Sequence, residues 1–268
     1  MKPLISAVTI SFNQAEFLRA AMDSILDQEA VEFEYIVCDP GSTDGSRDII
    51  SSYDDPRIIS VFEPDSGPAD GLNKGFARAR GDIFYYLNSD DMVLPGAFAR
   101  MAHFFAAHRD VDVACGHARV IDERGARVRR VWSEPFHRYA VAVGAHVQVQ
   151  PATFIRADAY HRAGGFDPND RGNWDGGLLT SLFLSGARID VVDAFLGCYR
   201  LHANSITMSG KLADQHHANA VRNFERLMNR PMASRDRIGG QALRWAKHFR
   251  HPWRTMERVR HGPLFQSG

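Results

Sequence analysis

The sequence contains a compact group of metal-binding residue types, Asn88-Ser89-Asp90-Asp91, directly after the apolar residues 83–87. A hard divalent cation prefers oxygen ligands and keeps several coordination positions for water and substrate phosphates. Carboxylates just beyond a strand end can hold such a cation against a diphosphate. Because Pro95 follows closely, the same tetrapeptide can also cap a helix. Taken alone, a group of this kind is more often a helix cap than a metal site.

Two polar clusters with the chemistry of a nucleotide site come earlier, each after an apolar run. A carboxylate at a strand end can accept hydrogen bonds from a nucleobase or from ribose hydroxyls, and small neighbours let the backbone approach a flat ligand. A turn that merely caps the next helix is an equally good interpretation of the second cluster. The candidate binding residues are Thr9, Ser11, Asn13, Asp39 and Ser42.

A third cluster contains Asp65 and Gly67, followed by Asp70, Asn73 and Lys74. If a helix begins near residue 69, the last three residues lie at positions i, i+3 and i+4 and share one face. An acceptor, an amide and a cation beside a Gly-rich entry suit a ribose and its phosphates. The alternative is an ordinary solvated helix face.

Strand-like and helix-like periodicities alternate through the first 120 residues, which predicts an α/β fold with a mostly parallel sheet covered on both faces. Ligands bind at the carboxyl ends of the strands in such sheets, where these clusters stand. The chain has neither a P-loop nor a G-x-G-x-x-G fingerprint. Residues 118–150 predict an antiparallel excursion, and residues 150–190 predict a return to helix. The expected strands are residues 4–11, 33–38, 58–62, 83–87 and 111–116. One helix is expected after Asn13 as its N-cap, and three others are expected to begin near Ser46, Ala69 and Pro95. A further helix is expected over residues 212–228.

Taken together and in this order, the four clusters resemble glycosyltransferase family 2, whose members have the GT-A fold, a Rossmann-like sheet. The resemblance covers roughly residues 3–205. It implies that Asp39 contacts the nucleobase, that Asp70, Asn73 and Lys74 line the ribose and phosphate site, and that Asp90 binds a cation, Mn²⁺ or Mg²⁺. It further implies that a nucleoside-diphosphate sugar is the donor substrate. Asn88 replaces the first Asp of the family's D-x-D motif, so the site loses one charge.

The second half of the resemblance concerns the acceptor. Inverting transfer needs a base that deprotonates the acceptor hydroxyl, and Asp175 stands at the expected position, with Asp167 as the alternative. Two residues depart from the family pattern: Trp174 stands where an acidic residue is frequent, and Gly177 where a second Asp is frequent. Residues 148–154 resemble the lining of the acceptor cleft. Residues 199–205 resemble the family's closing segment, in which His202 completes the metal shell while Arg200 and Ser205 bind phosphate oxygens.

These observations predict an enzyme with a GT-A domain over residues 1–210, divided into a donor half (about 1–116) and an acceptor half (about 117–210). The predicted reaction is inverting, metal-dependent sugar transfer to a hydroxyl of a saccharide or lipid-linked acceptor in bacterial surface polysaccharide synthesis. A catalytically inactive sugar-nucleotide-binding module is an alternative because of Asn88 and Gly177. A sugar nucleotidyltransferase is disfavoured, because the residues after the first strand are neither Gly-rich nor basic.

Charge divides the chain unevenly. Residues 211–268, a predicted helical extension, carry 12 Lys and Arg but 4 Asp and Glu, a net charge of +8, whereas the first 210 residues carry a net charge of −8. The whole chain has 32 Lys and Arg and 32 Asp and Glu, and this balance argues against a nucleic-acid binder. A basic extension with interleaved aromatic residues can lie on an anionic membrane or pack on the acidic body. We expect a cytoplasmic protein without a signal peptide or membrane span. If the extension lies on a membrane, the protein is peripheral at the inner membrane face. Cys38, Cys115 and Cys198 are expected to be reduced and buried.

Overall fold

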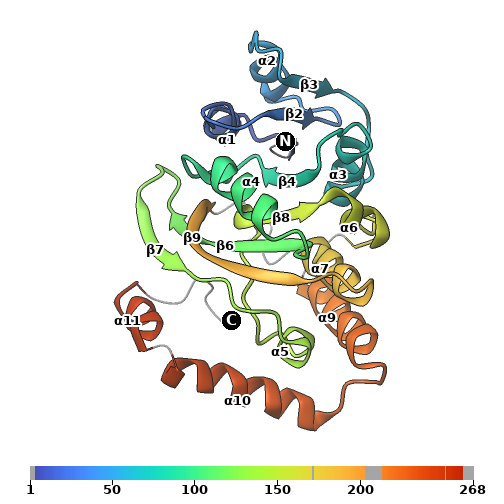
Figure 1. The fold of residues 1–268 in the computed structure, drawn as a ribbon, viewed down its shortest axis with the longest axis vertical. Coiled ribbons are helices and arrows are strands. Elements are labelled where there is room, and N and C mark those ends of the chain that lie inside the picture. Colours follow the sequence, from blue (N-terminus) through green and yellow to red (C-terminus); the bar gives the residue numbers. More distant parts are fainter. Residues whose placement is uncertain (1–3, 171, 203–212, 251, 262–268) are drawn as a thin grey trace.

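The computed structural model describes residues 4–170, 172–202, 213–250 and 252–261, which form a mixed α/β fold around one curled sheet (Figure 1). The described residues contribute nine strands to this sheet. Its strand order is β3-β2-β1-β4-β8-β6-β9-β5, and β7 pairs with β6 beside this path. The predicted fold class is confirmed.

The first half of the sheet is parallel and sets the geometry of the strand ends. It consists of β3 (Ile58–Val61), β2 (Phe33–Cys38), β1 (Ile5–Ile10) and β4 (Ile83–Asn88). In the register, Ile10 at the end of β1 lies opposite Cys38 on one side and Asn88 on the other. The loops that follow these three strands therefore leave the sheet at the same edge, as the alternation of strands and helices predicts.

The second half of the sheet is mixed. The strand β8 (Thr153–Arg156) runs antiparallel to both β4 and β6 (Val113–Ile121), and β9 (Ile189–Arg200) runs parallel to β6. The expectation of helix throughout residues 150–190 was wrong for β8. A four-residue apolar run carries no periodicity that separates a strand from a helix. The predicted antiparallel excursion is β7 (Arg127–Val131), which pairs with β6, while β5 (Met92–Val93) pairs with β9.

Helices cover both faces of the sheet. On one face, α1 (Ala15–Leu26), α2 (Ser46–Ser51) and α4 (Ala97–Ala107) pack on residues such as Ala7 and Tyr85. On the other, α3 (Pro68–Phe76), α6 (Ala157–Arg162) and α7 (Trp174–Leu184) pack on Val8 and Tyr86, among others. Alternate strand residues thus enter two separate cores, as the two-residue repeat of a strand requires.

One helix start differs from the expectation. The N-cap of α1 is Gln14, and its side chain does not cap the helix. Asn13, predicted as the N-cap, adopts a φ of 52° in the left-handed region, which Asn tolerates better than most residues. Its side chain then turns toward the loop after β2 instead of its own helix, with a consequence for the site described below.

The C-terminal extension consists of α9 (Ala213–Met228), α10 (Ser234–Arg250) and α11 (Pro252–His261). Phe224 and Leu227 of α9 are fully buried and pack with Val143 and other residues around α5 (Arg138–Ala142). Farther along, Lys247 pairs with Glu134 at 2.5 Å and Arg130 pairs with Glu257 at 3.2 Å. Figure 1 shows α10 along the end of the molecule opposite β3. The predicted boundary at residue 210 lies outside the described residues and stays a prediction.

The three cysteines are free and buried, as predicted. Burial raises the pKa of both Cys38 and Cys115 to about 12, so these thiols are protonated at neutral pH. In the described part of the chain, no helix combines the length and apolar character that crossing a bilayer demands.

Candidate active site

A cleft of about 610 Å³ opens where β1, β2 and β4 end, and we call it the strand-end cleft. Six of the predicted site residues line it: Ser11, Asp65, Gly67, Asn88, Ser89 and Asp90. Trp174 and Tyr199 also line it, although neither was predicted as a ligand-binding residue. The Ser11 Oγ is buried and has no hydrogen-bond partner among the described residues, so it is available to a ligand.

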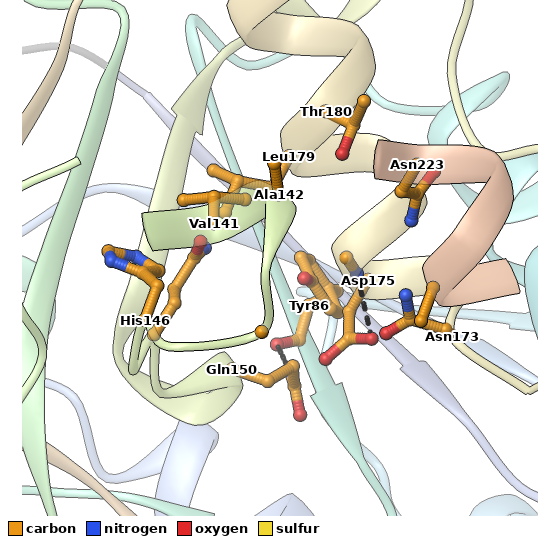
Figure 2. A pocket seen from close by; sticks show the side chains of 14 residues that line it. Tyr86, Val141, Ala142, His146, Gln150, Asn173, Asp175, Leu179, Thr180 and Asn223 are labelled. Atoms are coloured by element: carbon orange, nitrogen blue, oxygen red, sulfur yellow. Dashed lines mark hydrogen bonds between the residues drawn. The ribbon is translucent and has the colours of Figure 1, made fainter. Parts of the chain in front are cut away.

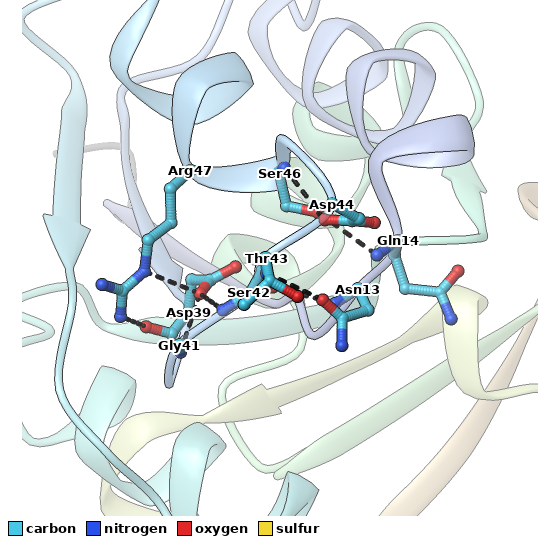
Figure 3. Close-up of polar contacts among 9 residues, drawn as sticks. All are labelled: Asn13, Gln14, Asp39, Gly41, Ser42, Thr43, Asp44, Ser46 and Arg47. Carbon is cyan, nitrogen blue, oxygen red and sulfur yellow. Dashed lines mark hydrogen bonds and ion pairs between the residues drawn. The ribbon is translucent and has the colours of Figure 1, made fainter.

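Hydrogen bonds between the loops after β1 and β2 fix one wall of this cleft (Figure 3). The Asn13 N–H donates to Ser42 Oγ at 2.8 Å, and the Thr43 N–H donates to Asn13 Oδ1 at 2.9 Å. Asp44 Oδ2 accepts from the Ala15 N–H at 2.9 Å. Asn13 and Ser42, predicted as ligand-binding residues, therefore hold the two loops together.

Asp39, the predicted nucleobase contact, is fully buried beside Pro40, which lines the cleft. Its Oδ1 accepts from the N–H groups of Gly41 and Ser42 and from Arg47 Nε, at 2.8–3.0 Å. Burial favours a raised pKa for this carboxyl, but hydrogen bonds from Ser42, Arg47 and Gly41 outweigh it and lower the pKa. Among the described residues, Oδ2 has no partner. The group is thus an ionised acceptor with one oxygen still available.

Thr9 lies elsewhere than expected. Its side chain is fully buried inside the sheet and accepts a hydrogen bond from the Tyr35 hydroxyl at 2.9 Å. It does not line the cleft. Since adjacent strand residues point to opposite faces, Ser11 and Thr9 share one face, and only the later residue reaches beyond the strand end.

The residues of α3 form contacts within their own loop. The Ser66 N–H donates to Asp70 Oδ2 at 2.8 Å, and this bond, followed by the bond from Lys74, lowers the pKa of Asp70. Lys74 Nζ also donates to the Pro64 carbonyl at 2.5 Å. Asp65 lies nearer the cleft, and burial raises its pKa. The predicted phosphate-binding face of α3 is therefore occupied by internal bonds at Asp70 and Lys74.

Asn73, predicted to line the ribose and phosphate site, bonds to the second half of the chain. Its Nδ2 donates to the Phe166 carbonyl at 2.8 Å, while its Oδ1 accepts from the Phe166 N–H at 3.0 Å and from the Tyr160 hydroxyl at 2.6 Å. The side-chain amide is thus directed at the Gly-rich loop before α7. It joins the first half of the chain to the second.

Asp90 and His202, the two predicted metal ligands, lie side by side. His202 Nε2 is 2.9 Å from Asp90 Oδ2, and the imidazole packs against Phe17 with ring centroids 4.7 Å apart. The Asp90 side chain is 20% exposed at the cleft, whereas His202 is 2% exposed. Two residues that are 112 positions apart in the sequence are therefore in contact.

The pair fits a divalent cation that takes further ligands from a substrate. Ligands in adjacent positions around Mg²⁺ lie about 3 Å apart, since each bond is about 2.1 Å long. The 2.9 Å separation of Asp90 and His202 agrees with that spacing. Across the described residues, no group of three or more His, Cys, Asp or Glu forms a metal-binding cluster. A cation held by this pair would take two ligands from the described residues.

Arg200, predicted to bind phosphate oxygens, braces the turn that carries Asp90. Its Nε donates to the Asp90 carbonyl at 2.7 Å, and its NH1 donates to the carbonyls of Asp122 and Glu123 at 3.0 Å. The guanidinium carbon also lies 4.9 Å from the Phe17 ring centroid. These contacts use most of the guanidinium donors inside the protein. Ser205, the other predicted phosphate ligand, lies outside the described residues.

Asp91 is the buried member of the tetrapeptide. Its Oδ1 accepts from the Arg200 N–H at 2.9 Å, which ties the end of β9 to the turn after β4. Burial, reinforced by the charge of Asp90, raises the pKa of Asp91 well above its usual value. Asp91 therefore shapes the turn, while Asp90 faces the cleft.

A second cavity of about 300 Å³, here called the α7 cavity, contains Asp175, the predicted base (Figure 2). Asp175 is the second residue of α7, and its Oδ1 accepts from the Gly176 N–H at 2.8 Å. Trp174, the residue before it, lines the strand-end cleft. Successive helix residues project about 100° apart, so the first turn of α7 can face both hollows.

The two hollows also meet at Asn88 and Gln150. Asn88 Nδ2 donates to Gln150 Oε1 at 3.1 Å, and Gln150 Nε2 donates to the Tyr86 carbonyl at 2.8 Å. Asn88 lines the strand-end cleft and Gln150 lines the α7 cavity. The departure from Asp at position 88 thus creates a neutral amide pair across the boundary between them.

The Gly177 departure has a steric cause. A Cβ at this position would lie 2.9 Å from Asp170 Oδ2. The buried Asp170 carboxylate accepts from the Asn173 N–H at 2.9 Å and from Arg222 of α9 at 3.1 Å. Asp167, the alternative base, accepts from the Asn169 N–H at 2.9 Å and shapes the loop.

Sequence reasoning missed several polar residues of the α7 cavity: His146, Thr180 and Asn223. His146 is partly buried, and burial lowers its pKa to about 4, so the imidazole is neutral at neutral pH. The one local signal in the sequence was Asn223, a polar residue between apolar positions of the amphipathic α9, which indicates a helix face that borders a cavity. His146 and Thr180 stand in stretches without any motif.

The chain matches the model described as Glycosyl transferase family 2 over residues 6–162, more than half of its length. An uncharacterized glycosyltransferase of Nostoc sp. is 25% identical over 220 residues, covering 78% of this chain and 68% of that protein. The putative teichuronic acid biosynthesis glycosyltransferase TuaG of Bacillus subtilis is 42% identical over 93 residues, which cover 34% of this chain and 37% of TuaG.

Two solved structures show the same fold. Staphylococcus aureus TarS 1–349 in complex with UDP-GlcNAc superposes with a TM-score of 0.67 at 17% identity, over 98% of this chain and 77% of that one. The mannosyltransferase PcManGT of Pyrobaculum calidifontis, in complex with GDP-Man and Mn²⁺, gives a TM-score of 0.66 at 18% identity, over 94% and 72%. The fold is of the GT-A type. The chain belongs to glycosyltransferase family 2.

The brace formed by Arg200 makes a prediction about stability. In Arg200→Met, the carbonyls of Asp90, Asp122 and Glu123 lose their side-chain donor, and each lost hydrogen bond to a charged group costs about 1.5–3 kcal/mol. We expect the melting temperature, measured by calorimetry, to fall by at least about 5 °C. The control is Arg119→Met, at an exposed position of the adjacent strand β6. Equal melting temperatures in the two variants would contradict the assignment.

Proposed function

We propose that this protein catalyses inverting, metal-dependent transfer of a sugar from a nucleoside-diphosphate sugar to a hydroxyl of a saccharide or lipid-linked acceptor. The observation that carries the proposal is the position of α7. Trp174 lines the cleft at the strand ends, while Asp175 lines the neighbouring cavity. A donor in the first hollow and an acceptor hydroxyl in the second would meet beside a carboxylate, which is the arrangement that inversion requires.

The strand-end cleft suits the donor. The available Oδ2 of Asp39 can accept from a base N–H or a ribose hydroxyl, and Ser11 Oγ is a second unpaired group. Asp65, Gly67 and Ser89 line the same hollow. The solved complexes of TarS with UDP-GlcNAc and of PcManGT with GDP-Man support a nucleotide sugar as donor, and the name of TuaG supports a place in surface polysaccharide synthesis.

Asp175 is the proposed base. Its carboxylate takes the proton of the acceptor hydroxyl as the oxygen bonds to the anomeric carbon, and the bond from that carbon to the diphosphate oxygen breaks. The nucleoside diphosphate leaves with the electron pair, and the configuration inverts. A cation held by Asp90 and His202 would offset the charge that develops on this leaving group. Arg200 keeps the Asp90 turn in place, and Trp174 lines the same cleft.

The first prediction tests the base. Purified protein is incubated with nucleoside-diphosphate sugars and Mn²⁺, and release of nucleoside diphosphate is measured with and without saccharide acceptors. In Asp175→Asn, we expect acceptor-dependent turnover to fall by about 10²- to 10⁴-fold while the donor dissociation constant is unchanged.

Asp167→Asn is the matched control, because Asp167 lies in the same region but shapes a loop. Wild-type turnover in Asp175→Asn, or an equal loss in Asp167→Asn, would refute the assignment of the base. Donor binding without turnover in the wild type would instead identify a sugar-nucleotide-binding module.

A second prediction concerns the cation. We expect Asp90→Asn and His202→Gln each to weaken Mn²⁺ binding, measured by electron paramagnetic resonance with nucleoside diphosphate present, by at least about tenfold. His117→Gln is the control, because His117 forms the same kind of pair with Asp193, at 3.1 Å, outside the cleft. Full turnover of the wild-type enzyme in excess chelator would disprove metal dependence.

We also propose that the extension contacts the inner face of an anionic membrane, as a lipid-linked acceptor would require. Its helices expose large apolar side chains, including Trp245 at 68% and Phe249 at 84% of their surfaces. The extension also carries the net charge of +8. Apolar side chains among basic residues are the pattern of helices that lie in the interface of anionic bilayers.

Vesicle flotation tests this contact. We expect the full-length chain to float with phosphatidylglycerol vesicles and to stay behind with neutral phosphatidylcholine vesicles. Flotation should be lost in Trp245→Ser combined with Phe249→Ser, both exposed and thus replaceable without loss of folding, and in a truncation after Asn229. Equal flotation of all forms would exclude the proposed surface.

A further inference from the structure

The α7 cavity contains an unusual concentration of buried polar atoms without protein partners. Thr180 is 1% exposed and Asn223 is 7% exposed, and both line the cavity. Neither Thr180 Oγ1 nor Asn223 Oδ1 has a hydrogen-bond partner in the part of the chain that is described. The same holds for His146 Nδ1 and Gln148 Oε1. Because buried polar groups in native proteins are almost always paired, four such atoms around one hollow require an explanation.

The chemistry of the lining favours a neutral, hydroxyl-rich ligand. The amide oxygens of Asn223 and Gln148 accept hydrogen bonds, and the Thr180 hydroxyl can donate or accept. Among the described lining residues, Asp175 is the one carboxylic acid, and His146 is neutral at neutral pH. Val141 and Leu179 add apolar surface. Figure 2 shows Thr180 and Asn223 together on one side of Asp175 and His146 across the cavity.

We propose that the α7 cavity binds one neutral sugar ring of the acceptor, with ring hydroxyls donating to Asn223 and Gln148 and bonded to Thr180. The C–H face of the ring lies on Val141 and Leu179. The volume of about 300 Å³ is at the small end of ligand sites and suits a single ring. The role as acceptor site rests on the proposed function, because the reacting hydroxyl would be the one that faces Asp175.

The C-terminal extension completes this binding site. Asn223 and Ala220 of α9 form one wall of the cavity. Two bonds from the same helix fix the loop before α7: Asn219 Nδ2 donates to Asp170 Oδ1 at 2.5 Å, and Arg222 pairs with Asp170 Oδ2 at 3.1 Å. The helix thus both contributes a ligand-binding side chain and positions the start of α7.

Ligand-detected NMR on the full chain tests the proposal with defined probes. The probes are the methyl glycosides of glucose, galactose, mannose and N-acetylglucosamine, compared with cyclohexylmethanol, a six-membered ring with a single hydroxyl. We expect at least one glycoside to bind, and cyclohexylmethanol to bind at least tenfold more weakly. The near-isosteric variants Thr180→Val and Asn223→Leu should each weaken glycoside binding by about five- to tenfold, the effect of one lost hydrogen bond.

Two neighbours that do not line the cavity serve as controls. Ser181→Ala lies next to Thr180 on α7, and Glu225→Gln lies on the exposed side of α9. Neither should change glycoside binding. The melting temperatures of Thr180→Val and Asn223→Leu should equal or exceed that of the wild type, because an unpaired buried polar atom is removed. A fall in melting temperature would show that these side chains serve folding and would overturn the proposal.

Two further outcomes would overturn it: failure of every glycoside to bind, or binding that is equal in the variants and the wild type, which would show that the polar atoms bind water alone. Hydrolysis of the nucleotide sugar, measured in parallel, separates this proposal from the proposed function. Intact hydrolysis without glycoside binding refutes the cavity assignment alone. Glycoside binding without any donor turnover refutes the enzymatic function and leaves the sugar site standing.

Discussion

The buried guanidinium of Arg200 holds together the part of the molecule on which the site depends. It bonds to backbone carbonyls of two separate segments, the turn after β4 and the loop after β6. A charge removed from water is tolerated only when its donors are satisfied, and here carbonyl oxygens and the face of Phe17 satisfy them. Because Asp90 belongs to the braced turn and His202 follows Arg200 by two residues, one side chain sets the position of both proposed cation ligands.

A second constraint joins the two halves of the chain. Asn73 of α3 forms hydrogen bonds with the backbone of Phe166, in the loop before α7. Asp170 of the same loop is paired with Arg222 of α9. The loop before α7 is thus fixed from both sides, which determines where Trp174 and Asp175 point. The proposed chemistry requires a donor and an acceptor at a fixed distance, and these bonds provide that rigidity without covalent cross-links.

Much of the parallel half of the fold could be predicted from the sequence. Each of its strands is apolar and ends in a polar cluster, and the register at Ile10 brings those ends together. The mixed half was harder, because β8 is a four-residue strand whose partners lie far away in the sequence. The periodicity within β8 does not predict that this strand pairs with β4 and β6.

The predicted site, like the fold, divides into a part that the sequence could predict and a part that it could not. The meeting of Asp90 with His202 and the place of Asp175 in a cavity agree with the sequence pattern. The pattern could not tell a ligand contact from a structural one. Arg200 and Asn73 have the residue types of phosphate and ribose binders, yet their partners are backbone groups of distant segments. A motif specifies a residue and its neighbourhood, whereas its partner depends on how the whole chain packs.

The bonds between Asp170 and α9 have a consequence for how family 2 glycosyltransferases built in this way diversify. The proposed donor cleft lies at the strand ends, where the register leaves little freedom, whereas one wall of the α7 cavity belongs to a helix appended after the sheet. Substitutions in α9 can reshape that wall while the strand ends stay unchanged. Under the proposed function, two copies that arise by gene duplication would diverge in the acceptor hydroxyl and keep a common donor. The appended helix is the segment in which such divergence should accumulate first.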